Sequence, residues 1–140
     1  MFGAGTLDER MKRRSIYFMI KRSKLIPSMQ LFDSPEPLVS QGSRPATIIA
    51  PQALHFMNNG QVREAAVALA KQLEQSPDTA DAVTRGYQTV LGRAPTAEEQ
   101  KSITAFIEAQ TKSYPNNGPQ LALADFAQVL FGLNEFIYVQ

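Results

Sequence analysis

The sequence predicts a mainly α-helical protein, in which an extended, proline-containing N-terminal arm with one short strand precedes a small helical bundle of three main helices and one short helix. Three observations predict this class. Apolar residues recur with helical spacing beyond residue 60. Residues that start and stop helices punctuate the same part of the chain. The preceding part instead contains four prolines, spaced too closely for long helices: Pro27, Pro35, Pro37 and Pro45. We therefore divide the chain into an N-terminal arm, residues 1–48, and a C-terminal helical module, residues 49–140.

The composition fits one small domain and excludes several kinds of site. The chain has 140 residues, of which 44% are apolar, and its formal net charge is +1. It contains no cysteine and one histidine, which excludes disulfides, thiolate metal sites and sites built from several histidines. We therefore expect no metal and no cofactor. No apolar stretch approaches the roughly 20 residues that span a bilayer, so we expect no membrane insertion. The N-terminus lacks the apolar core of a signal peptide.

The arm contains a short run of apolar residues. The run from Ile16 to Ile20 is continuously apolar, as in a strand that is buried on both faces. A strand needs a neighbour for its backbone N–H and C=O groups, and this chain offers a second candidate only at residues 136–139. The alternative neighbour is an upstream domain of a longer parent protein.

Positive charge is concentrated around this run. The first 24 residues carry a net charge of +5, and the remainder of the chain carries −4. One hypothesis is that the basic residues contact an anion or a nucleic acid. The other is that they flank the strand and pair with acidic residues of another protein domain. Because the overall net charge is near zero, we favour a protein partner and expect no nucleic acid. The candidate interaction surface consists of Arg13, Arg14, Tyr17, Lys21, Arg22, Lys24 and Arg93.

Local signals place the helices of the module. Pro51 suits the first turn of a short helix. An apolar stripe predicts a main helix over residues 61–75. Ser76 is expected to cap the next helix, with Pro77 in its first position. Gly92 is expected to end that helix in a left-handed conformation.

A capping box is the clearest local signal in the second half of the module. Thr96 and Glu99 have the spacing at which each side chain accepts the other residue's backbone N–H. We expect Arg93 to hydrogen-bond the carbonyls at the preceding helix end. The capped helix should end near Ser113, and Pro119 should begin a last helix, followed by an apolar tail. The predicted core consists of Leu69, Val83, Tyr87, Phe106, Ile107, Phe126 and Leu130.

An ordered set of short blocks resembles the planctomycete-type family known as domain of unknown function 1553. The blocks are residues 7–9, 13–18, 21–27, 31–35, 50–54, 57–59, 62–64, 90–93, 95–96, 134–136 and 138–139. The resemblance implies a large, usually exported parent protein that commonly carries a cytochrome-c-like segment upstream. It implies periplasmic or secreted localisation for full-length relatives. No catalytic residues are assigned in the family, so none is carried over, and we expect this chain to be a truncated member.

The side chains that could support catalysis have simpler roles. His55 lies in a short apolar helix and is expected at its boundary. The capping box accounts for Glu99, and a helix N-terminus favours Glu98. We therefore expect a structural or interaction module that is not an enzyme, forming the C-terminal portion of a larger exported protein. The alternative is an accessory domain of a haem-linked oxidoreductase or a polysaccharide-processing enzyme whose catalytic parts lie upstream.

Overall fold

The computed structural model describes residues 5–10, 14–21, 24–34, 42 and 50–138. The chain forms two compact units, Met1–Gln52 and Ala53–Gln140. The first contains a 3-10 turn, η1 (Ser15–Tyr17), and a short helix, α1 (Pro27–Leu31), and α2 (Ala50–Asn58) begins at its end. The predicted boundary between residues 48 and 49 lies outside the described residues.

The second unit is a helical bundle, as the sequence predicts. Its long helices are α3 (Gly60–Leu73), α4 (Thr79–Leu91), α5 (Ala97–Ser113) and α6 (Gly118–Phe131), and α7 (Asn134–Ile137) is a final single turn. The described bundle thus has four long helices where we expected three. The expected helix ranges already included all four, because Pro119 was expected to begin a last helix, and that helix is α6, with 14 residues.

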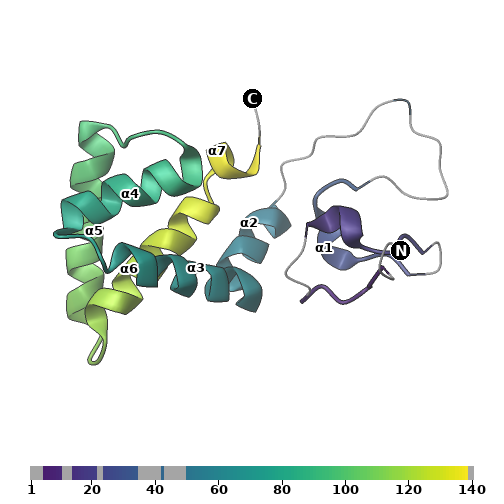
Figure 1. The fold of residues 1–140 in the computed structure, drawn as a ribbon, viewed down its shortest axis with the longest axis horizontal. Helices are drawn as coiled ribbons and strands as arrows, with labels where there is room; N and C mark the ends of the chain where they lie inside the picture. The colour runs from purple at the N-terminus through teal and green to yellow at the C-terminus, as the bar shows by residue number, and fades with distance from the viewer. Residues whose placement is uncertain (1–4, 11–13, 22–23, 35–41, 43–49, 139–140) are drawn as a thin grey trace. The chain divides into compact units, whose positions relative to one another are not determined.

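Helix α6 lies at the centre of this bundle. It packs against α3, α4, α5 and α7, and Figure 1 shows it, in yellow-green, crossing the unit between them. Its central position follows from its sequence, because apolar residues occupy most of its faces. Six of its side chains are buried: Ala122, Leu123, Ala124, Phe126, Ala127 and Leu130.

The predicted core is confirmed. Leu69, Val83, Tyr87, Ile107, Phe126 and Leu130 are buried in one cluster, and Phe106 packs against it as a partly buried side chain.

The predicted capping box and the predicted glycine stop are confirmed. Thr96 and Glu99 form the capping box that opens α5, and Gly92 ends α4 at a φ of 73°. The predicted start of α4, with Ser76 as cap and Pro77 in the first position, is wrong, because the helix begins at Thr79. Asp78, not Ser76, caps that helix, and its carboxylate accepts the N–H of Asp81 at 2.7 Å. Ser76 donates its N–H to the carbonyl of Leu73, so it lies in the turn that follows α3.

The predicted strand over Ile16–Ile20 is absent from the described residues. Part of it forms η1, and Phe18 makes only an isolated parallel bridge with Thr6. The reason is the missing neighbour: one bridge is too short for a ladder. The candidate partner strand within this chain, residues 136–139, is helical at residues 136–137, which belong to α7, and residue 139 lies outside the described residues. Ile16 and Ile20 are consequently exposed, at 72% and 77%.

A glycine in α4 permits the close approach of α6. A Cβ added at Gly86 would lie 2.7 Å from Cε1 of Phe126, a core side chain, whereas one added at Gly60 would meet nothing within 4 Å. We expect Gly86→Ala to lower the free energy of unfolding by about 1–3 kcal/mol, because overpacking outweighs the gain in helix propensity. Gly60→Ala, the matched control, should be neutral or slightly stabilising. Urea denaturation measures both, and equal effects would contradict this packing of α4 on α6.

Candidate functional site

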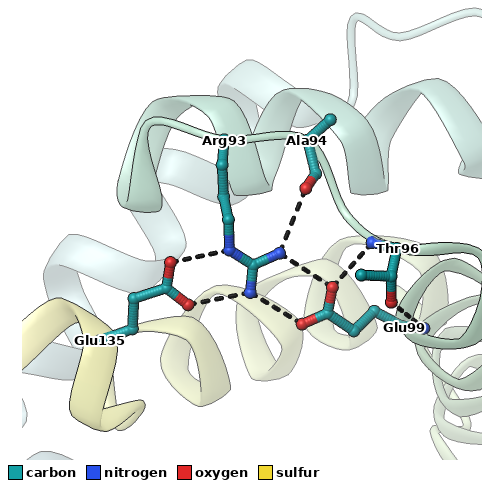
Figure 2. A network of polar contacts seen from close by, with 5 residues as sticks. All are labelled: Arg93, Ala94, Thr96, Glu99 and Glu135. Atoms are coloured by element: carbon teal, nitrogen blue, oxygen red, sulfur yellow. Dashed lines mark hydrogen bonds and ion pairs between the residues drawn. The ribbon is translucent and has the colours of Figure 1, made fainter.

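A cluster of charged side chains in the second unit lies where α4 turns into α5. Gly92 adopts the left-handed conformation that ends α4, so the next residue, Arg93, leaves the helix and extends along the bundle. Thr96 then starts α5. The short connection places Arg93 between Glu99, in the first turn of α5, and Glu135 on α7 (Figure 2). We call Arg93, Glu99 and Glu135 the arginine latch.

All five N–H groups of the Arg93 guanidinium are hydrogen-bonded. Nε and Nη2 donate to the two oxygens of Glu135 at 2.7 and 2.8 Å. Nη2 and Nη1 donate to the two oxygens of Glu99 at 2.8 and 2.9 Å. Nη1 also donates to the carbonyl of Ala94 at 3.1 Å. Each carboxylate is therefore held by two parallel hydrogen bonds, the geometry in which arginine binds carboxylates most strongly.

The latch also covers one edge of the core. The guanidinium carbon of Arg93 lies 5.2 Å from the centroid of the Tyr87 ring, within the range of a cation–π contact. Tyr87 in turn stacks on Phe126 at 6.3 Å between centroids. Burial raises the pKa of Tyr87, and the nearby carboxylates add to this effect. The cluster thus joins a charged surface network to the apolar interior.

Both latch carboxylates are held in the ionised form. The hydrogen bond from Arg93, and then that from the backbone N–H of Thr96, lower the pKa of Glu99 to about 2. The hydrogen bond from Arg93 also lowers the pKa of Glu135, and the two carboxylates raise the pKa of Arg93. Carboxylates with lowered pKa values are poor general acids at neutral pH. The arrangement is therefore suited to fixing helices in place.

The structure revises the expected role of Arg93. We expected it to bond carbonyls at the end of α4, but its one carbonyl acceptor is Ala94, in the connection, and its main partners are carboxylates. As a member of the candidate interaction surface it has no guanidinium N–H left for a partner. The hydrogen bond that the Glu99 side chain accepts from the backbone N–H of Thr96 was predicted. The pairing of Glu99 with Arg93 was missed, although the two residues are only six positions apart in the sequence. Glu135, 42 positions from Arg93, gave no local signal.

The other predicted surface residues belong to the first unit. Arg14, Tyr17, Lys21 and Lys24 are exposed. A backbone hydrogen bond from Lys24 to the carbonyl of Lys21, in an isolated bridge, brings the two lysines close together. Arg13 and Arg22 lie outside the described residues.

A second polar network was missed by sequence analysis. Arg63 on α3 pairs with Asp125 on α6 at 2.7 Å, and the hydroxyl of Tyr114 donates to the same carboxylate at 2.7 Å. Gln128 accepts from Arg63 and donates to the carbonyls of Phe56 and Met57 at the end of α2. The hydrogen bond to Asp125 raises the pKa of Tyr114. These partners are 11 to 72 positions apart, so no local pattern indicates them.

The described residues contain neither a metal-binding group of side chains nor a helix that could span a membrane. Among the described residues, no three His, Cys, Asp or Glu side chains gather as a metal-binding group. His55 is partly buried on α2, as expected, and its ring contacts Phe56 edge-on at 5.9 Å. None of the described helices has the length and apolarity needed to cross a bilayer.

Comparison with known proteins identifies a family. The model of PSD1, protein of unknown function (DUF1553), matches residues 4–107. The matched segment includes Arg93 and Glu99, whereas α6 and Glu135 lie beyond it. Neither the curated proteins nor the solved structures contain a significant match.

Replacing the latch arginine tests its bidentate geometry. We expect Arg93→Lys to lower the melting temperature, because a lysine ammonium cannot hold two carboxylates by parallel bonds. Arg85→Lys is the matched control, since Arg85 makes one exposed pair, with Asp81, on α4. The free energy of unfolding of the Arg85→Lys variant should stay within about 0.5 kcal/mol of the wild-type value, so its melting temperature should barely change. A smaller loss for Arg93→Lys than for Arg85→Lys would contradict the latch.

The lowered pKa of Glu99 predicts an acid-dependent contribution to stability. Above pH about 4.5, the ordinary value, Glu99 is ionised in both folded and unfolded chains, and its latch contribution is complete. As the pH falls toward about 2, the unfolded chain takes up the proton first, so this contribution is lost. We expect Glu99→Gln to destabilise the protein above pH 4.5 and the difference from wild type to shrink toward pH 2. Urea titrations at several pH values measure it, and a difference that is constant with pH would contradict the prediction.

Proposed function

Because the chain belongs to the DUF1553 family of proteins of unknown function, we propose that it is a non-catalytic interaction module of a larger exported protein, and that its arm binds an acidic protein surface. The exported parent is an inference from the family resemblance. The partner is either an upstream domain of that parent or a separate protein.

The observation that carries the proposal is the exposure of large apolar side chains beside positive charge. Ile16, Tyr17 and Ile20 are 72%, 52% and 77% exposed. Arg14, Lys21 and Lys24 flank them and are exposed as well. We call these six residues the arm surface. Exposed apolar groups that occur together mark interaction sites more often than scattered ones do.

The two kinds of side chain have complementary effects on binding. Burial of the isoleucines and the tyrosine ring would supply favourable free energy, since apolar burial contributes about 25 cal/mol per Å². The three cations would steer an acidic partner and fix its orientation. Arg14, Lys21 and Lys24 form no ion pair with any described residue. Their charges are therefore free to meet the acids of a partner.

The same features favour protein over nucleic acid as the partner. Nucleic-acid binding depends mainly on neutralising phosphates, and proteins that bind in this way usually carry a large positive charge. This chain has a net charge of +1. Aliphatic side chains such as Ile16 and Ile20 suit a protein interface better than a phosphate backbone.

Site-specific crosslinking tests the proposal. The photoreactive residue p-benzoylphenylalanine, placed at Ile20 in cells that produce the full parent protein, should give one defined protein adduct. The same residue at Lys101, an exposed position on α5, is the control and should give none. The adduct should fall about tenfold or more with Lys21→Glu and Lys24→Glu together, because both charges then repel an acidic partner.

Mass spectrometry of the crosslinked peptide identifies the partner surface. A peptide rich in Asp and Glu, from the parent or from another protein, is the expected result. Adducts to nucleic acid, equal adducts from positions 20 and 101, or insensitivity to charge reversal would each contradict the proposal.

A further inference from the structure

A pocket of about 500 Å³ opens at one end of the bundle. It is bounded by the C-terminal ends of α3 and α5 and by the N-terminal ends of α4 and α6. The arginine latch lies at the other ends of α4 and α5, so the two sites do not share residues. The volume is within the range of about 300–1,000 Å³ that is typical of small-molecule sites.

The floor of the pocket is part of the hydrophobic core. Leu73, Ala82, Ile107 and Leu123 line it, and each is less than 10% exposed in the folded chain. These four side chains come from four different long helices, so the floor is fixed by the packing of the bundle. An apolar ligand group would contact a preformed surface there and would not need to order a loop.

The wall formed by the α3–α4 connection contains a hydroxyl without a partner. Ser76 Oγ is buried, and no described residue forms a hydrogen bond with it. A buried polar group of this kind is uncommon, because leaving it unpaired costs free energy. The same connection contributes the carboxylates of Glu74 and Asp78 to the pocket lining. One short segment thus contributes two negative charges to the pocket.

The charges around the opening favour a cation. Glu74, Asp78 and Glu108 contribute three carboxylates, and Lys112 contributes one ammonium. The helix dipoles offset one another, because two N-terminal and two C-terminal helix ends meet here. The side chains therefore decide the sign of the local potential, which is negative.

We propose that this pocket binds a small organic cation with an apolar body and a primary ammonium head. The apolar body lies on the floor formed by Leu73, Ala82, Ile107 and Leu123. The ammonium, which has three N–H donors, lies at the α3–α4 connection, beside the carboxylates of Glu74 and Asp78. This proposal is independent of the arm surface and its partner.

Three six-carbon probes with different heads test the proposal on the full 140-residue chain. Hexylammonium, hexanol and hexanoate share one apolar body and differ in charge. Titration followed by amide NMR should show saturable shifts at the pocket-lining residues for hexylammonium. Hexanoate should bind about fivefold or more weakly, because the carboxylates repel it. Raising the salt concentration should weaken the binding of hexylammonium and leave the binding of hexanol unchanged.

Two variants locate the ammonium head. Glu74→Gln, at the α3–α4 connection, should weaken hexylammonium binding most, and Glu108→Gln, across the opening on α5, should weaken it less. Neither should change hexanol binding. The matched control is Glu64→Gln, which replaces an exposed carboxylate on α3 outside the pocket. It should change the affinity for neither hexylammonium nor hexanol. Equal affinity for all three probes, shifts outside the pocket, or no saturable binding would overturn the proposal. So would unaltered hexylammonium binding in both pocket variants, provided that their amide spectra show the native fold.

Discussion

The burial of α6 is the constraint on which the rest of the bundle depends. A helix that is apolar on most of its faces must be covered from several sides, and α3, α4 and α5 provide that cover. Gly86 lets α4 approach closely enough for Phe126 to pack against its backbone. The polar residues that α6 does carry, Asp125 and Gln128, are consequently placed against the neighbouring helices. They pair with Arg63, Tyr114 and the last carbonyls of α2.

The two ends of the bundle have different chemistry for a physical reason. At the latch end, Arg93 uses all of its donors on two carboxylates and closes the connection between α4, α5 and α7. Its charge is compensated within the fold, so it has little capacity to bind anything else. At the pocket end, the carboxylates of Glu74, Asp78 and Glu108 face one lysine, and the core reaches the surface between them. Uncompensated charge beside apolar surface is what a ligand can recognise.

The arm shows how far local sequence can be interpreted. Its continuous apolar run resembles a buried strand, but a strand is stable only when another strand supplies hydrogen bonds along its length. In the described residues Phe18 bridges Thr6 and nothing longer forms. The result is that Ile16 and Ile20 are exposed next to cations, and this segment is the surface to which we assign partner binding.

What the sequence determined by itself is what depends on neighbours within a few positions. The periodicity of the helices, the capping box at Thr96, the left-handed Gly92 and the composition of the core follow from spacing along the chain. The family was also recognisable from short ordered blocks. Even a local rule can leave a choice, as between Ser76 and Asp78, since both residue types cap helices well. The packing of the helices determines which carboxylates Arg93 holds, how Arg63 meets Asp125, and where a pocket opens. Those partners are up to 62 positions apart, and they meet because helices that bury one shared apolar helix have few ways to pack around it.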